Sequence, residues 1–234
     1  VTGLPTGISG SFASGVFTIS GAATQSGTFP YVVTTVGGCG VASLSGTITI
    51  NPNVTIALNS VLSSDNQRLC IDNPIAPITY LLGNGATGAT LVSGTVPVGI
   101  SGSYNPLTHI FTISGTVQEV GVFNYVISTT GGCSSASLTG RIIVDPKPVV
   151  RLPQGGFICV DELGSPISTY TLYTGMDSSM YDFEWSTTTG VIAGANGPSY
   201  VATAPGIYSV KVTNKVTGCD DTAQALIAPS LPPS

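Results

Sequence analysis

Charged side chains are scarce in this sequence of 234 residues. They make up 7% of the chain, whereas a typical soluble domain has about 25%. The 6 Lys and Arg residues form no basic run, and with 11 Asp and Glu residues the net charge at pH 7 is −5. Nucleic acid, an anionic membrane and polyphosphate ligands are therefore not expected as partners, because each needs a gathered positive charge. We expect exposed faces of Ser, Thr, Asn and Gly.

Residue types that carry catalysis or bind metals are equally scarce. His109 is the only histidine, and the 5 cysteines include no Cys-x-x-Cys pair. A zinc site or a Ser-His-Asp triad therefore has little to be built from. No apolar run approaches the roughly 18 residues of a membrane-spanning helix. The sequence predicts no enzyme, no cofactor, no metal site and no insertion into a membrane.

Glycine and proline, in contrast, are abundant. The chain has 30 Gly and 16 Pro residues with 42% hydrophobic content, which indicates short strands and many turns rather than helices. Residues 17–52 align without a gap with residues 111–146, and 19 of these 36 positions are identical. A period of about 95 residues is the size of one small β domain. The sequence predicts an all-β chain of tandem β-sandwich domains arranged end to end.

This repeat divides the chain into four segments. We expect the C-terminal half of a truncated repeat, a complete repeat, a third domain and a linker to the next domain, at residues 1–52, 53–147, 148–228 and 229–234. The third domain is expected to open with a strand at Val149–Leu152. The segments that join the domains contain proline and are short, so we expect them to be stiff. The chain is accordingly interpreted as a fragment of a longer protein.

The five cysteines recur with a regular spacing. Cys70 precedes Cys133 by 63 residues, and Cys159 precedes Cys219 by 60 residues. This similarity predicts one disulfide within each complete domain, Cys70–Cys133 and Cys159–Cys219, formed in an oxidising compartment. Cys39 matches Cys133 in the repeat, and its partner would precede the first residue, so we expect Cys39 to be unpaired by truncation. Buried free thiols in a cytosolic protein are the alternative, but they leave the repeated spacing unexplained.

Aromatic residues indicate where the cores lie. Trp185, the only tryptophan, stands between Cys159 and Cys219, an order reminiscent of immunoglobulin (Ig) domains, in which a core tryptophan packs on the disulfide. We therefore expect Trp185 in the core against that bridge, and a sugar-stacking tryptophan at the surface is the alternative. Tyr31 and Tyr125 occupy matching positions inside alternating strands, which also favours the core.

Five carboxylates are the remaining candidates for a binding site. Oxygen ligands of this kind can hold calcium, but no spaced calcium-loop motif is present. Solvated loop carboxylates are the favoured interpretation, and calcium binding stays open. The residues are Asp177, Asp182, Glu184, Asp220 and Asp221.

Several motifs carry a resemblance to a known family. The second domain contains Cys70-Ile-Asp-Asn-Pro-Ile75, Phe111-Thr-Ile-Ser-Gly115 and Gly131-Gly-Cys133. This pattern resembles the tandem Ig-like repeats of giant cell-surface proteins of Bacteroidota, in particular the gliding-motility adhesins of the SprB type. The third domain, with Glu184-Trp-Ser-Thr187 and Pro205-Gly-Ile-Tyr-Ser-Val-Lys-Val212, resembles the PKD-like repeats that accompany them.

The resemblance carries expectations about function. It implies secretion by the type IX system, extracellular display on the outer membrane, and partnership with neighbouring repeats and the gliding machinery. Asp221-Thr-Ala223 resembles the O-glycan acceptor of Bacteroidota proteins, which makes Thr222 a candidate glycosylation site. Two functions follow: an extended stalk of an adhesin filament that serves cell adhesion and gliding motility, or a lectin-like module that binds surface polysaccharide. An exposed aromatic platform would distinguish the second from the first.

Overall fold

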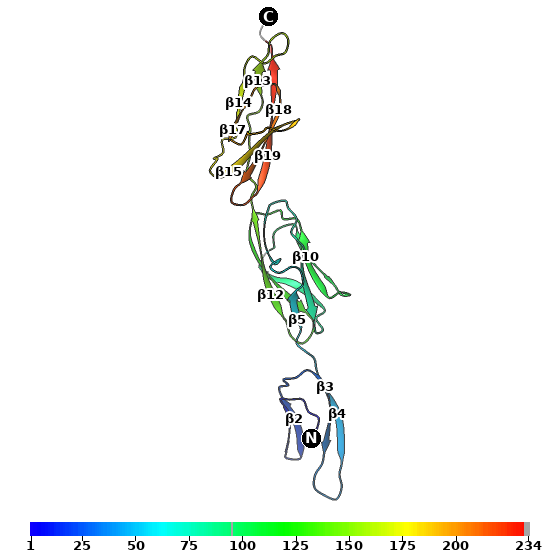
Figure 1. The fold of residues 1–234 in the computed structure, drawn as a ribbon. Helices are drawn as coiled ribbons and strands as arrows, with labels where there is room; N and C mark the ends of the chain where they lie inside the picture. Colours follow the sequence, from blue (N-terminus) through cyan, green and yellow to red (C-terminus); the bar gives the residue numbers. More distant parts are fainter. Residues whose placement is uncertain (95, 232–234) are drawn as a thin grey trace.

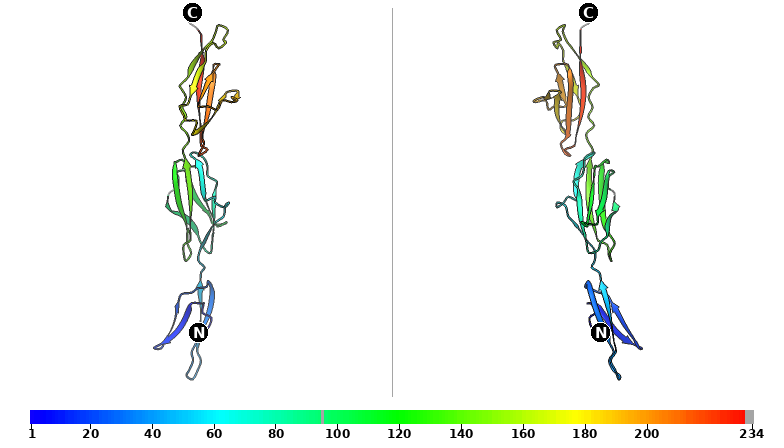
Figure 2. Two further views of the ribbon diagram at one scale, coloured as in Figure 1. Left: turned by 60° about the vertical axis from the view of Figure 1, so that its left-hand side comes forward. Right: turned by 90° about the vertical axis from the view of Figure 1, so that its right-hand side faces the viewer.

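The computed structural model describes residues 1–94 and 96–231 of the chain. Three units of strands follow one another along a rod in Figure 1, and the views of Figure 2 keep this elongated outline. Every regular element in the described residues is a β-strand, and no helix suited to cross a membrane occurs among them. The chain is therefore all-β. Residues 232–234 of the expected final linker lie outside the described residues.

The first unit consists of two antiparallel hairpins. Ser14 and Gly15 turn the first hairpin with positive φ angles of 51° and 86°, the conformation that a two-residue hairpin loop favours. Most side chains of the unit are exposed, and Phe12 is 70% exposed, because two hairpins provide only part of a sandwich. The paired strands are β1 (Ile8–Ala13) with β2 (Val16–Gly21) and β3 (Gly27–Thr34) with β4 (Ser43–Ile50).

The second unit is a complete sandwich of two four-stranded sheets. One sheet has the order β5-β7-β10-β9, and the other has the order β6-β12-β11-β8. β6 lies at an edge and runs parallel to β12, whereas all other paired strands of the unit are antiparallel. The strands are β5 (Thr55–Leu58), β6 (Asn66–Cys70), β7 (Ile78–Gly83), β8 (Gly88–Gly94), β9 (Ile100–Asn105), β10 (Ile110–Gly115), β11 (Gly121–Thr130) and β12 (Ser137–Asp145).

Alternation along the strands builds the core between these two sheets. On β11, Phe123, Tyr125 and Ile127 are buried while the residues between them are more exposed, as a period of two requires. Tyr125 lies opposite Gly140 on β12, and its ring occupies the space that a side chain at Gly140 would need. Tyr31 lies on Gly46 in the same way in the first unit, so the sequence repeat is also a repeat of packing.

The third unit is a smaller sandwich with its own core. Its larger sheet has the order β13-β19-β18-β15-β16, and β14 pairs with β17 in the other sheet. β13 runs parallel to β19, as β6 does to β12 in the second unit. The strands are β13 (Gly156–Cys159), β14 (Tyr170–Tyr173), β15 (Tyr181–Thr187), β16 (Gly190–Val191), β17 (Ser199–Ala202), β18 (Gly206–Asn214) and β19 (Asp220–Ser230).

Two boundaries of the third unit differ from the sequence-based prediction. Val149–Leu152 forms no strand, although Val150 and Leu152 pack against the core, and the first strand begins only at Gly156. At the other end, β19 continues through Pro229 and Ser230, within the segment that the sequence predicts to be a linker. Pro229 is tolerated because β18 pairs no further than Ile227, so only β13 accompanies the end of β19.

Candidate functional site

The candidate functional site of the described residues is the junction between the second and third units. β12 ends at Asp145, and the chain then crosses to the third unit through Pro146-Lys147-Pro148. Because β6 runs parallel to β12, Cys70 lies directly opposite Asp145 at the same end of the sandwich. The last residue of β6 therefore stands beside the linker.

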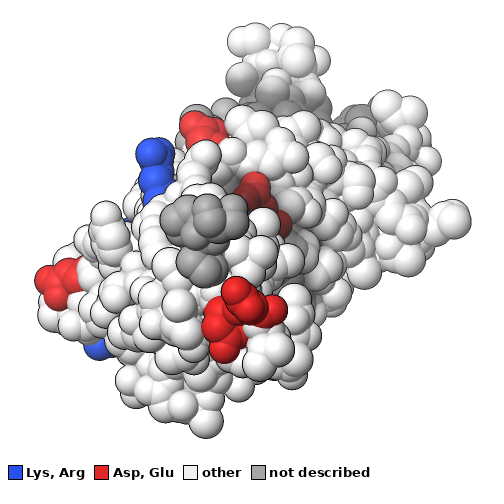
Figure 3. Space-filling model, turned by 90° about the horizontal axis from the view of Figure 1, so that it is seen from above, with Lys and Arg blue, Asp and Glu red and all other residues white. Residues whose placement is uncertain are grey.

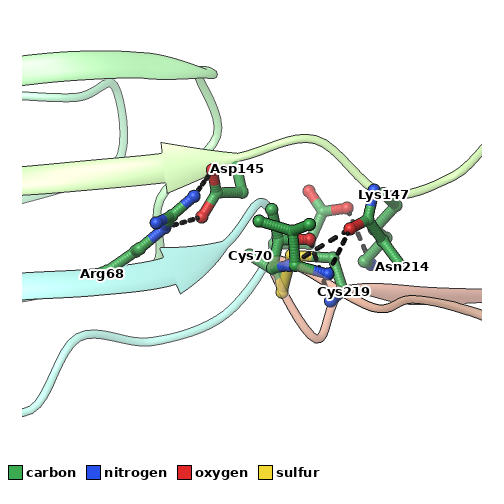
Figure 4. The surroundings of a disulfide bond; sticks show 9 residues. Arg68, Cys70, Asp145, Lys147, Asn214 and Cys219 are labelled. Carbon is green, nitrogen blue, oxygen red and sulfur yellow. Dashed lines mark hydrogen bonds and ion pairs between the residues drawn. A yellow bond between two sulfur atoms is a disulfide. The ribbon is translucent and has the colours of Figure 1, made fainter. Parts of the chain in front are cut away.

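Cys70 is covalently bonded to Cys219 of the next unit. The two Cα atoms are 5.5 Å apart, the S–S distance is 2.03 Å, and 149 residues of sequence separate the partners. Figure 4 shows β6 and β12 reaching the bridge from one unit and the β18–β19 hairpin reaching it from the other. The two units are therefore joined twice, once by the linker and once by this disulfide.

Two ion pairs lie beside the bridge, both formed by residues of the second unit and the linker. Arg68 Nε and Nη2 donate to the two carboxylate oxygens of Asp145 at 2.6 and 3.1 Å. The hydrogen bond and the charge of Asp145 raise the pKa of Arg68 above its ordinary value. Lys147 Nζ, in the linker itself, donates to Asp72 Oδ2 at 3.1 Å. These contacts hold the end of β12 and the linker against the segment that carries Cys70 (Figure 4).

The hairpin that presents Cys219 is ordered by its own hydrogen bonds. Asn214 Oδ1 accepts from the backbone N–H groups of Val216 and Thr217 at 2.9 and 3.1 Å. The N–H of Asn214 donates to the carbonyl of Cys219 at 2.8 Å, which closes the turn. Cys219 is fully buried. The bonded sulfur is thus fixed by local structure on the third unit as well as by β6 on the second.

The predicted pairs Cys70–Cys133 and Cys159–Cys219 are not formed, so that prediction is wrong. Cys39, Cys133 and Cys159 are free and exposed. Cys133 precedes β12, whereas Cys70 lies opposite the last residue of β12, so the nine residues of that strand separate the two. At about 3.3 Å per residue this is roughly 30 Å, far beyond the ~7 Å limit between bonded Cα atoms. β19 separates Cys219 from Cys159 in the same way.

Trp185 lies in the core of the third unit and is fully buried. Its indole Nε1 donates to the carbonyl of Gly197 at 2.9 Å, and its ring packs against that of Tyr200 at 5.8 Å between centroids. It does not pack on a bridge within the unit, because Cys159 is free. Tyr208 on the neighbouring strand donates its hydroxyl to the carbonyl of Ala204 at 2.8 Å, the tyrosine corner of Ig-type sandwiches.

The five carboxylates of the third unit do not gather into a site. Within residues 1–94 and 96–231, no group of three or more metal-ligating side chains is present. Asp182 and Asp220 pair with Lys215 and Lys211 at 3.5 and 3.2 Å. Asp177 accepts from the backbone N–H of Ser179 at 2.8 Å, and hydrogen bonds from Ser179 lower its pKa. Four of the five carboxylates thus take part in local hydrogen bonds or surface ion pairs, with Asp221 Oδ1 accepting from the N–H of Thr222 at 2.9 Å.

The other sequence candidates lie apart from the junction. His109 sits in the turn between β9 and β10, where its Nδ1 is 3.1 Å from the hydroxyl of Tyr104. Thr222 is exposed on β19 and lies opposite Lys211. The sequence-based predictions missed the bond across the junction, because spacing along the chain does not show which end of a sandwich a cysteine occupies.

Comparisons with known proteins support the fold. No protein-family model and no curated protein matches the sequence. A three-domain I-band fragment of titin and its glutamate-to-alanine variant each match 96% of this chain and 82% of their own length, at 13% identity and a TM-score of 0.57. The N-terminal eight Ig domains of Down Syndrome Cell Adhesion Molecule match 97% of this chain and 31% of their own, at 12% identity and a TM-score of 0.43. The chain is similar to tandem Ig domains, and its strands form Ig-like sandwiches.

Proposed function

We propose that this chain is a segment of an extended adhesin stalk that is secreted, displayed on a bacterial surface and used in cell adhesion and gliding motility. The bridge between successive domains carries the proposal. A disulfide within a domain stabilises that domain, whereas Cys70–Cys219 fixes the position of one domain on the next. A bond of this second kind suits a structure that transmits force or holds a distance.

The arrangement of the units supports a spacer function. The units succeed one another along one direction in Figures 1 and 2. Proline limits the bending of the linkers, at Pro52 after the first unit and at Pro146 and Pro148 after the second. The Lys147–Asp72 ion pair further restrains the second linker. A chain with these properties keeps its two ends apart.

Low charge is a further property of the surface. Seen from the C-terminal end in Figure 3, few charged residues stand on a largely uncharged surface. The lectin-like alternative depends on an exposed aromatic platform, and Trp185 is buried. Phe12, Phe157 and Tyr173 are exposed, but they belong to different strands and no ring stacking joins them.

Partners and location follow from the resemblance described above rather than from the geometry. The type IX secretion system would export the chain, and the gliding machinery would move the filament along the outer membrane. Neighbouring repeats of the same polypeptide are the most direct partners, and the disulfide between the second and third units supports this choice.

Small-angle X-ray scattering on the oxidised chain tests the stalk. Two and a half sandwiches of about 40 Å each give an expected maximum dimension of roughly 100 Å. The reduced chain should show a broader distribution of distances, because only the linker then orients the third unit. A maximum dimension near 60 Å, about that of a globule of this mass, would contradict the stalk and favour a binding module with an inter-domain cleft.

A further inference from the structure

The cysteines of the chain are of two kinds that the fold distinguishes. Hairpin cysteines lie in the connection between the last two strands of a unit: Cys39, Cys133 and Cys219. Strand-end cysteines close the strand that runs parallel to the last strand: Cys70 opposite Asp145 and Cys159 opposite Ser230. The observed disulfide joins one of each kind, a strand-end cysteine to the hairpin cysteine of the following unit.

The position of Cys133 shows that the junction between the first and second units is arranged like the junction between the second and third units. Asn51 corresponds in the repeat to Asp145, the residue opposite Cys70. The side chain of Asn51 donates its Nδ2 hydrogen to Cys133 Sγ at 3.6 Å. The Cys133 thiol of the second unit thus lies at the end of the last strand of the first unit. Cys219 of the third unit has the same place at the end of the last strand of the second unit. Cys133 stands beside the place that a strand-end cysteine of a complete first unit would take.

We propose that Cys133 and Cys159 each form a disulfide of the Cys70–Cys219 type with a cysteine of an adjacent repeat of the same polypeptide. Cys133 would bond the strand-end cysteine of the preceding repeat, and Cys159 the hairpin cysteine of the following repeat. Both thiols are exposed and free in this chain. Each bond forms by thiol–disulfide exchange with a small disulfide such as oxidised glutathione: two thiols lose two protons and two electrons, and the oxidant leaves as two thiols.

Such bonds would make the filament nearly inextensible. A covalent path would enter at Cys133, follow β12, the linker and β13 to Cys159, and leave through the next bridge. This path of about 26 residues measures about 90 Å when extended, and it spans two sandwiches of roughly 80 Å together. It is almost taut in the folded state. A second path would run from Cys39 through β4, β5 and β6 to Cys70 and on to Cys219. Tension would pass along these two paths and leave the remaining strands unloaded.

The bond of Cys159 can be tested by extending the chain at its C-terminus. A second copy of residues 149–234 is placed after Ser234, with the copy's own Cys159 replaced by serine. The copy brings a complete domain with its own core. After refolding in a glutathione buffer, the non-reducing tryptic map should show Cys159 bonded to the appended Cys219, together with the native Cys70–Cys219 bond. The two copies of Cys219 lie on tryptic peptides of different length, so the map separates them.

Two control variants make this test decisive. Replacing the appended Cys219 by serine should leave Cys159 reactive toward iodoacetamide, whereas Cys133→Ser should leave the new bond unchanged. A blue-shifted fluorescence emission from both tryptophans, as expected of buried indole rings, shows that both copies are folded. A free Cys159 in a folded chain that has formed Cys70–Cys219, or a Cys159–Cys219 bond within one domain, would overturn the proposal.

The bond of Cys133 is tested at the other end. Residues 53–92 are duplicated in front of Val1, which supplies the first unit with counterparts of β5, β6, β7 and part of β8. The added copy of Cys70 should bond Cys133 and protect it from alkylation. A bond from that copy to Cys39 would place the disulfide inside one domain and would refute the proposal. So would a reactive Cys133 in a chain whose added segment resists proteolysis.

Discussion

Tyr80 and Tyr125 meet hydroxyl to hydroxyl at 3.0 Å between the two sheets of the second unit. They come from β7 and β11, and both side chains are almost completely buried. Each hydroxyl is the partner of the other, so the two sheets share one hydrogen bond in an otherwise apolar core. The pair offers an internal test of the packing between the sheets.

Either single change, Tyr80→Phe or Tyr125→Phe, should destabilise the second unit by about 1–3 kcal/mol, because the remaining hydroxyl loses its buried partner. The double change should cost clearly less than the sum of the two, since both polar groups are then removed. Urea unfolding of the four proteins measures the difference. Additive effects would show that each hydroxyl has another partner.

The same pair predicts a loss of stability at alkaline pH. Burial is the largest cause that raises the pKa of both phenols above their ordinary value of 10.0. The folded state therefore holds phenolic protons that the unfolded state releases. This stabilisation is complete below pH 10 and is lost as the pH rises beyond it. Thermal unfolding of the second unit should shift to lower temperature above pH 10, and the shift should shrink in the double Phe variant.

Replacing Trp185 should destabilise the third unit and leave the stability of the second unit unchanged. Trp185→Ala leaves a large cavity and an unpaired carbonyl at Gly197, so we expect a loss of roughly 3–5 kcal/mol. The second unit has a separate core and should keep its unfolding transition. In the native protein the tryptophan emission should be blue-shifted and resist quenching by iodide. Emission typical of water and quenched by iodide would instead revive the sugar-platform interpretation.

The thiols give a direct chemical check of the junction. Iodoacetamide should label Cys39, Cys133 and Cys159 in the folded, oxidised chain, because all three are exposed. Cys70 and Cys219 should react only after reduction. Labelling of Cys219 without reductant would show that the bridge is absent. The variant Cys70→Ser provides the reference, since its Cys219 has no partner.

The sequence predicted the strands and the core aromatics well because these depend on local pattern. Alternating residues on β11 face the core wherever a sandwich forms, and the Tyr125 position is repeated at Tyr31. The Tyr31 side chain is nevertheless only half-buried, since the first unit has no strand that corresponds to β7 and no partner for its hydroxyl. Burial depends on the other sheet, which the local pattern does not contain.

The disulfide could not be predicted from spacing, because spacing along the chain does not say which end of a sandwich a residue occupies. Cys70 and Cys133 belong to one unit but lie at opposite ends of β12. The parallel pairing of β6 with β12 decides this, and it is a long-range contact. An equal spacing in two units is just as well explained by bonds between units, since every unit then contributes one cysteine to each of its two junctions.

The bridge should also limit how far the chain can be extended by force. When both termini are pulled, load passes from Cys70 through the disulfide to Cys219, and the residues between them cannot lengthen. The oxidised chain should therefore reach a contour length of only about 300 Å, whereas the reduced chain should reach about 800 Å. Single-molecule force spectroscopy with and without reductant measures both lengths. Cys70→Ser should behave like the reduced chain under all conditions, and Cys39→Ser should behave like the native protein. Equal lengths before and after reduction would mean that the two units are joined by the linker alone.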